Sequence, residues 1–468
     1  MEKYINKVKP LYFQVLMIII TLVSSSTYLR IKFGSYAIYG LAFGVFIIVL
    51  TMFSGSFKRV LSERINWLLI AFSAFYLVSI IVCRQSELIN NLKQLIFMVV
   101  FFYLFTMLPS IDSDEEKEKC LRIVVWVYVV VTFVIAIVSF YMFLIGFSSV
   151  GVDPETGLTF YLGMTWTRLS GIYNSNTSAS IFSTSFILSL ALIFDYKHEK
   201  NDAFRNIVCA VNVLNLLLQL SCVILAASRG ANYSLCCAVF AFAFFAFYTV
   251  KSNKKLFLRI LVSFCMGVIF LMLFLGFMKI MQVGIAYLPS FFENNSPSVS
   301  SVVYSPQKIE IEFEKTNIDR DYSDDITTGR MDIWKAGIAI FRDNWMLGIP
   351  YESLKDLGNK YFEALGVDSS YLNSGGTFHN ILLSCLVSSG VLGFIPMVAY
   401  IVIKIIKSLK VILSQTLFSP IYILPFIVVL MAIANEMVES RILYSVNILN
   451  VIFWIMMGYL PNEKKDAT

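Results

Sequence analysis

The sequence lacks most of the short motifs on which soluble enzymes are built. It has only two histidines, His198 and His379, and contains no glycine-rich phosphate loop, HExxH or GxSxG element. ATP-driven and protease chemistry therefore have no support in the sequence. Neither an internal repeat nor a low-complexity tract is visible.

Cysteine usage excludes two further classes of site. The eight cysteines form no CxxC pair, and none falls in the longest polar stretch, residues 282–378. They lie in or beside apolar runs, which is typical of small apolar helix residues. No disulfide framework or cysteine metal site is predicted. The net charge of +6 does not point to a nucleic acid partner, because the placement of Lys and Arg matters more than their sum in a membrane protein.

The sequence is instead rich in long apolar runs. Hydrophobic residues make up 58% of its 468 residues, against about 45–50% in soluble domains. Runs of about 20 apolar residues recur, each long enough to cross the hydrocarbon core of a bilayer. We therefore expect an all-α polytopic membrane protein with about twelve transmembrane helices. The predicted spans lie near residues 11–28, 36–54, 66–83, 93–109, 122–146, 177–195, 206–227, 231–250, 257–281, 380–405, 418–436 and 442–460.

Basic residues predict the orientation of these spans. If the N-terminus is cytoplasmic, every inner segment carries at least two Lys or Arg, such as Lys58 and Arg59 or Lys404 and Lys407, and the short outer connections carry fewer. Both termini are then cytoplasmic. The first run, preceded by three lysines, resembles a signal peptide, but this topology requires that it be retained.

The same reading divides the chain into three parts. Residues 1–281 hold helices one to nine, residues 282–378 form one large extracytoplasmic loop, and residues 379–468 hold helices ten to twelve. Within the loop, residues 308–314 alternate in polarity and fit a short strand or an extended arm. Two amphipathic helices follow, one with Trp334 on its apolar face and one around 354–365. We expect a small cap that acts as a lid over the membrane surface.

Arginines on the predicted outer side are the first candidates for chemistry. Arg229 stands in a connection of about three residues, so its guanidinium is expected at the outer rim of the membrane, where such residues usually face a polar cavity. Arg168 and Arg330 also lie outside, and the planar fork of arginine matches phosphate oxygens. Three converging arginines would suit a diphosphate. The alternative is that they contact lipid phosphates or cap helix ends.

The other titratable residues leave similar alternatives open. His379 stands where the loop re-enters the membrane and can exchange a proton near neutral pH, or it is an ordinary interfacial histidine. Asp321, Asp324 and Asp325 can bind a divalent cation or form a solvated acidic turn. Glu436 and Glu439 flank the outer end of the eleventh span, with only weak support for a role.

Four short motifs occur in a recognisable order. They are Arg168-Leu169-Ser170-Gly171 with Asn174 and Asn176; Ser228-Arg229-Gly230-Ala231; Gly329-Arg330 through Trp334, followed by Asp343-Asn344-Trp345 and Leu347-Gly348-Ile349; and His379-Asn380 with Leu382-Leu383, Gly390 and Gly393. With the single large outer loop, this set resembles the O-antigen ligase and O-antigen polymerase (Wzy-type) superfamily over about residues 168–400. Asn344-Trp345 and Ile349-Pro350 depart from the family pattern in the loop turn.

The resemblance implies a glycosyltransferase at the outer face of the bacterial cytoplasmic (inner) membrane. Such an enzyme moves a glycan from undecaprenyl diphosphate to an acceptor hydroxyl, without a metal or other cofactor. The implied partners are the undecaprenyl-diphosphate-linked donor and acceptor glycans and the lipid bilayer, with no nucleic acid. A chain-length regulator protein stays open as a further partner.

The resemblance also implies roles for individual residues. Arg229 and Arg330 would hold the diphosphate, and His379 would be the general base or would orient the acceptor hydroxyl. The implied substrate-binding residues are Arg168, Asn176 and Asn380.

Three functions remain to be separated. A polymerase that joins repeat units of O-antigen, capsule or exopolysaccharide is favoured on the number of such sequences alone, and a ligase that transfers the glycan to lipid A core or another acceptor would use the same site. A flippase for the same lipid-linked sugars is the alternative of a different class. Transporters usually place charged sites near the membrane midplane and show repeat symmetry. This sequence shows no repeat, and its candidate arginines and His379 are predicted at one face of the membrane.

Overall fold

The computed structural model describes residues 10–33, 36–153, 159–165, 167–250, 255–289, 330–366, 377–415 and 417–462. The predicted strand or arm at 308–314, the Asp321–Asp325 cluster and the side chain of His198 lie outside the described residues.

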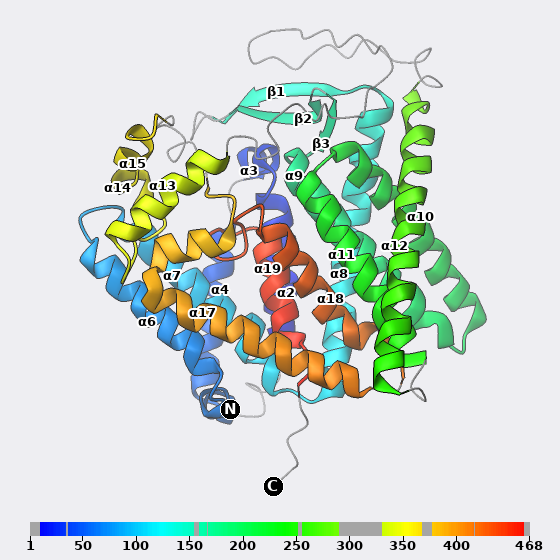
Figure 1. The fold of residues 1–468 in the computed structure, drawn as a ribbon, viewed down its shortest axis with the longest axis horizontal. Coiled ribbons are helices and arrows are strands. Elements are labelled where there is room, and N and C mark those ends of the chain that lie inside the picture. The colour runs from blue at the N-terminus through cyan, green and yellow to red at the C-terminus, as the bar shows by residue number, and fades with distance from the viewer. Residues whose placement is uncertain are drawn as a thin grey trace.

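Helices make up most of the described chain (Figure 1). The first part contains α2 (Pro10–Ser24), α3 (Thr27–Phe33), α4 (Ala37–Met52), α5 (Gly55–Ser62), α6 (Asn66–Val82), α7 (Leu88–Phe101), the π-helix η1 (Phe102–Met107), η2 (Pro109–Ile111) and α8 (Asp114–Leu144). Then come α9 (Ser175–Asp195), η3 (Tyr196–His198), α10 (Asp202–Ala226), α11 (Arg229–Val250) and α12 (Leu256–Ala286). The last part contains α13 (Arg330–Asp343), α14 (Leu354–Leu357), α15 (Asn359–Glu363), α17 (Ile381–Ser414), α18 (Pro420–Glu436) and α19 (Ile448–Tyr459).

The helical membrane prediction is confirmed in its coarse form. In the described ranges, seven helices are long and apolar enough to cross a membrane, and up to nine if each of two bent pairs is one span. The pairs are α2 with α3 and α4 with α5, which bend by 104° and 93°. The shorter apolar helices α6, α18 and α19 match three more predicted spans. The twelve-span topology and the cytoplasmic termini stay predictions.

Two predicted boundaries shift, and the first has a local cause. The last span was predicted from residue 442, but α19 begins only at Ile448, because the side chain of Asn447 accepts hydrogen bonds from the backbone N–H groups of Leu449 and Asn450. The ninth span was predicted to end at 281, whereas α12 continues to Ala286. The centre of the bundle is α19, in which every residue is buried, and α12 instead exposes most of its apolar side chains.

A three-stranded antiparallel sheet adds to the predicted all-α fold. The strands β1 (Ser148–Val152), β2 (Thr159–Thr165) and β3 (Arg168–Gly171) pair in the order β1-β2-β3. They are too short to produce a clear alternating pattern, and a bulge between Gly163 and Met164 interrupts the register. The last strand carries Arg168 to the start of α9.

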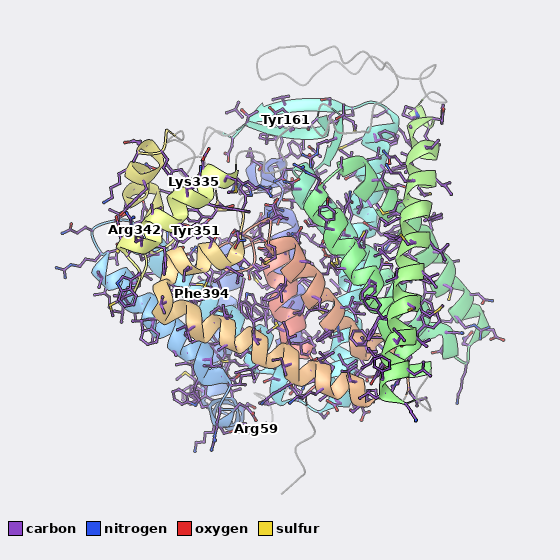
Figure 2. The ribbon with its side chains drawn as sticks, viewed as in Figure 1. Arg59, Tyr161, Lys335, Arg342, Tyr351 and Phe394 are labelled. Atoms are coloured by element: carbon purple, nitrogen blue, oxygen red, sulfur yellow. The ribbon has the colours of Figure 1, made fainter. Side chains whose placement is uncertain are left out.

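The two ends of the bundle differ. Figure 1 shows the sheet and α13–α15 toward one end of the bundle. Lys335 and Arg342 of α13 lie at the first end, whereas Arg59 of α5 lies at the second (Figure 2). We call residues 330–366 the cap.

The cap has a small apolar core of its own. As predicted, an amphipathic helix follows Arg330, and the expected second helix is split into α14 and α15. The core is completed by residues on either side of His379, which ties the cap to the start of α17. Its buried members are Ala336, Ile340, Ile349, Leu354, Phe362, Phe378 and Val387.

A break in α17 receives the turn that follows α13. Gly390 has φ of +57° and ψ of −172° inside the helix, and Gly348 has φ of +69°. In place of helical bonds, Ile349 N–H donates to the Val387 carbonyl at 2.9 Å and Val391 N–H donates to the Trp345 carbonyl at 2.8 Å. Backbone groups freed by the break are therefore satisfied by the cap.

Polar side chains of α6 and α7 hold the other side of the cap. Tyr351 N–H donates to the Tyr76 hydroxyl at 3.1 Å. Asn91 accepts from Glu352 N–H at 3.1 Å and donates to Ser353 Oγ at 2.8 Å. The cap is thus docked on the bundle on two sides.

We predict that Gly390→Ala weakens this docking. A Cβ at residue 390 would lie 2.2 Å from the Met346 carbonyl oxygen, and alanine at a positive φ is itself strained, so the expected loss of stability is about 3 kcal/mol. Thermal unfolding of the detergent-purified protein measures it. The matched control is Gly276→Ala in α12, where an added Cβ meets nothing within 4 Å. Equal melting of the two variants would contradict this role for Gly390.

Candidate functional site

The loop between α18 and α19 carries a buried carboxylate at the centre of the candidate site. Glu439 is 6% exposed. The loop is shaped by Glu436, whose Oε2 accepts hydrogen bonds from the backbone N–H groups of Arg441 and Ile442. Asn447 Nδ2 also donates to the Arg441 carbonyl at 3.0 Å. These bonds fix the backbone on the C-terminal side of Glu439.

Glu439 collects partners from four segments of the chain. Its Oε1 lies 3.2 Å from Asn176 Nδ2 of α9 and 3.9 Å from Arg330 Nη2 of α13. Its Oε2 lies 3.2 Å from Arg441 Nη2 and 3.5 Å from His379 Nδ1. We call these five residues the Glu439 cluster. Residues separated by more than 260 positions in sequence, such as Asn176 and Glu439, thereby meet in one site.

The electrostatics of the cluster favour a bound anion. Burial by itself would raise the pKa of the Glu439 carboxyl, but Arg441, His379 and Arg330 outweigh it and hold that pKa below its usual value. Two arginines face one carboxylate, so the cluster keeps an excess of positive charge. The Arg330 and His379 side chains are 24% and 28% exposed, so a ligand can reach them.

Arg168 stands behind the cluster. Its Nε donates to the Ala226 carbonyl at 2.9 Å, and its Nη2 donates to Asn176 Oδ1 at 2.7 Å. The first bond caps the C-terminus of α10, where Ala227 turns the chain with φ of +47°. The second leaves Asn176 Nδ2 facing Glu439. Arg168 thus reaches the carboxylate through Asn176.

Arg229 begins α11 next to the loop that carries Glu439. A Cβ at Gly230 would lie 2.7 Å from Val438 Cγ2, and Ala231 packs in a small cluster with Ala179 and Ala226. The helix start therefore lies directly against the residue that precedes Glu439. No described residue makes a hydrogen bond or an ion pair with the Arg229 guanidinium, which leaves its five N–H donors for a ligand.

His379 is held between the cap and the Glu439 loop. Trp334 Nε1 of α13 donates to the Phe378 carbonyl at 2.8 Å, and His379 itself has φ of +48°. A non-glycine residue in this region is uncommon and is found preferentially at functional sites.

Asn380 mainly holds the backbone at the start of α17 and in the Glu439 loop. Its side chain caps α17 by accepting from Leu383 N–H at 3.0 Å, and its Nδ2 donates to the Met437 carbonyl at 3.3 Å. Its own N–H donates to Ser440 Oγ at 3.2 Å. These bonds join the start of α17 to the loop on both sides of Glu439.

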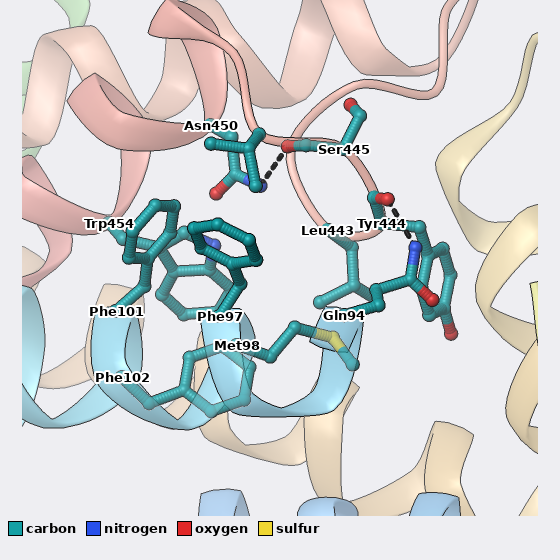
Figure 3. Close-up of a pocket in the computed structure, with 11 residues that line it drawn as sticks. Gln94, Phe97, Met98, Phe101, Phe102, Leu443, Tyr444, Ser445, Asn450 and Trp454 are labelled. Carbon is teal, nitrogen blue, oxygen red and sulfur yellow. Dashed lines mark hydrogen bonds between the residues drawn. The ribbon is translucent and has the colours of Figure 1, made fainter. Parts of the chain in front are cut away.

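The rest of the same loop borders a small cavity. Residues 443–446 line it together with α7, η1 and α19 (Figure 3). Gln94 Nε2 donates to the Tyr444 carbonyl, and Asn450 Nδ2 donates to the Ser445 carbonyl. Phe97, Phe101 and Trp454 form the aromatic wall. Both ends of the loop are thus anchored in the bundle.

The structure brings together part of the predicted residue set. His379, Arg330 and Asn176 meet at Glu439, Arg168 lies behind Asn176, and Asn380 is a helix cap beside them. Sequence reasoning gave Glu439 only weak support and assigned no role to Arg441. The available signal was two carboxylates and an arginine within six positions between two apolar helices, residues 436–441. The described residues contain no group of three or more potential metal ligands.

We predict that Arg441→Ala destabilises the protein far more than loss of a surface ion pair. Removing Arg441 leaves a buried carboxylate without its closest cation, which typically costs about 3–5 kcal/mol. Arg205→Ala, which breaks the pair with Asp202 whose side chain is 77% exposed, should cost at most about 0.5 kcal/mol. Thermal unfolding at neutral pH compares them. Similar melting of both variants would show that Glu439 does not depend on Arg441.

Comparison with known proteins bears on a segment that holds part of the site. No curated protein matches the chain. Residues 214–398 match the family described as O-Antigen ligase. The matched segment includes Arg229, Arg330 and His379, whereas Glu439 and Arg441 lie beyond it. The match over residues 214–398 supports a relationship of this segment to the O-antigen ligase and polymerase superfamily.

Proposed function

We propose that the protein is a polysaccharide polymerase of the bacterial cytoplasmic membrane. It would join undecaprenyl-diphosphate-linked repeat units at the outer face. The family match supports glycan transfer, and the observation that carries the proposal is the excess of arginine around Glu439, at the cap end of an apolar bundle. A diphosphate attached to a membrane lipid is an anion that can reach a site at the cap end of an apolar helical bundle.

Arg229 and Arg330 would bind the donor diphosphate. Arg330 stands 3.9 Å from Glu439, whereas Arg441 stands 3.2 Å from it. Arg441 is therefore the main counter-ion of the carboxylate, and Arg330 can turn to a phosphate at small cost. The Arg229 guanidinium, which has no hydrogen-bond or ion-pair partner among the described residues, supplies a second planar fork for phosphate oxygens.

The proposed step is a direct displacement at the donor sugar. The acceptor hydroxyl oxygen forms a bond to the anomeric carbon, and the bond from that carbon to the diphosphate oxygen breaks. The departing diphosphate keeps the electron pair, and Arg229 and Arg330 stabilise its growing charge. His379 takes the hydroxyl proton as general base. In this proposal the arginines do the work that a metal does in other transferases.

A ligase would use the same groups, so the acceptor decides between the two functions. If the acceptor is another lipid-linked repeat unit, the product is a longer glycan on the lipid. If it is lipid A core or another molecule, the glycan leaves the polyprenyl carrier entirely. A flippase would need neither a base nor bond breakage.

We predict that Arg229→Ala and His379→Ala each lower elongation at least about 100-fold, since each removes a group that acts in the transition state. Purified protein is incubated with polyprenyl-diphosphate-linked repeat units, and mass spectrometry measures product length, with and without chelator. The control is Arg84→Ala, an exposed arginine of the α6–α7 connection.

Elongation by both variants at the wild-type rate would overturn the mechanism. Transfer to lipid A core without elongation would replace polymerase by ligase. Loss of wild-type activity with chelator would assign a metal to the reaction. No product from wild-type protein with either acceptor would reject the transferase function.

A further inference from the structure

We propose that Glu439 is the positioning residue of the general base. Its carboxylate holds the His379 imidazole through Nδ1, so that Nε2 faces the acceptor hydroxyl. This inference rests on the proposed function, and it concerns a residue outside the family-matched segment.

The ring nitrogen on the inner side of His379 is buried without a hydrogen-bond partner among the described residues. Glu439 Oε2 lies 3.5 Å from it, which is slightly longer than a formed hydrogen bond. In enzymes without bound substrate, such contacts are often long and tighten when the substrate arrives. A small movement of either group would satisfy Nδ1 and fix the ring.

The carboxylate is held in place independently of His379. Asn176 donates to Oε1 and is itself held by Arg168, which bonds to the carbonyl end of α10. Arg441 binds Oε2 and also donates from Nη1 to Thr177 Oγ1 at 3.1 Å. Supporting bonds of this kind fix the orientation of a catalytic group in advance.

The two carboxylate oxygens of Glu439 contact different partners. Oε2 faces Arg441 and His379, whereas Oε1 faces Asn176 and the more distant Arg330. With the Nδ1 proton directed at Oε2, the lone pair of Nε2 is free to take the hydroxyl proton. The negative carboxylate then stabilises the imidazolium that forms, as an acidic residue does in other histidine-based sites.

The experiment compares wild type, Glu439→Gln, His379→Ala and the double variant in the elongation assay. Glu439→Gln should lower kcat about 100-fold or more while the donor KM stays within about twofold, since the arginines remain in place. The double variant should be no slower than His379→Ala, because two residues that act as a unit are not additive. Glu352→Gln in the cap, where the side chain pairs with Lys355 at 2.6 Å and with no other side chain in the described part of the protein, is the matched control and should match wild type.

Three results would overturn the proposal while wild type and the control remain active. They are a Glu439→Gln variant with wild-type kcat, a loss confined to KM, and losses that multiply in the double variant. If Glu439→Gln does not fold, Asn176→Ala takes its place and must show the same pattern of kcat, KM and non-additivity. An inactive wild type would instead reject the proposed function, so the two failures are distinguishable.

Discussion

A single buried carboxylate organises the functional end of this protein. Glu439 can stay ionised at 6% exposure only because cations surround it, since an unpaired charge in that position would be very costly. Satisfying it requires that α9, the cap and the start of α17 meet at one loop. The interaction therefore links structure to chemistry. Arg441 is the main counter-ion of Glu439, and the same carboxylate brings together Arg330 and His379, the groups proposed to serve a diphosphate and an acceptor hydroxyl.

The docked cap stabilises the arrangement of α9, α13 and the start of α17 around Glu439. Its turn at Gly348 occupies the break in α17 at Gly390, and its polar backbone is bonded to α6 and α7. Arg330 at one end of α13 and His379 just before α17 thus belong to one docked unit. The described part of the cap is anchored on two sides of the bundle, and the expectation that the large loop acts as a lid stays a prediction.

The sequence could predict the features that depend on neighbouring residues, but not those that depend on contacts between residues far apart in the chain. Helices such as α10 and α13 follow from apolar periodicity, and His379 stood out because it is one of only two histidines and the only one on the predicted outer side. Glu439 was underrated because its significance depends on Asn176 and Arg330, which are distant in sequence, and periodicity carries no information on such contacts. Arg168 was expected to bind substrate, yet its bond to the Ala226 carbonyl fits the capping alternative. The three short strands of the sheet have no alternation of apolar and polar residues clear enough to predict them from sequence.

The most direct test of this account is an experimental structure of the protein with a bound polyprenyl-diphosphate sugar. The account predicts that Arg229 and Arg330 contact the diphosphate oxygens, that Arg441 stays on Glu439, and that His379 Nδ1 approaches Glu439 to hydrogen-bond distance. A diphosphate bound away from Arg229, or a His379 ring turned away from Glu439 while the donor is in place, would contradict it.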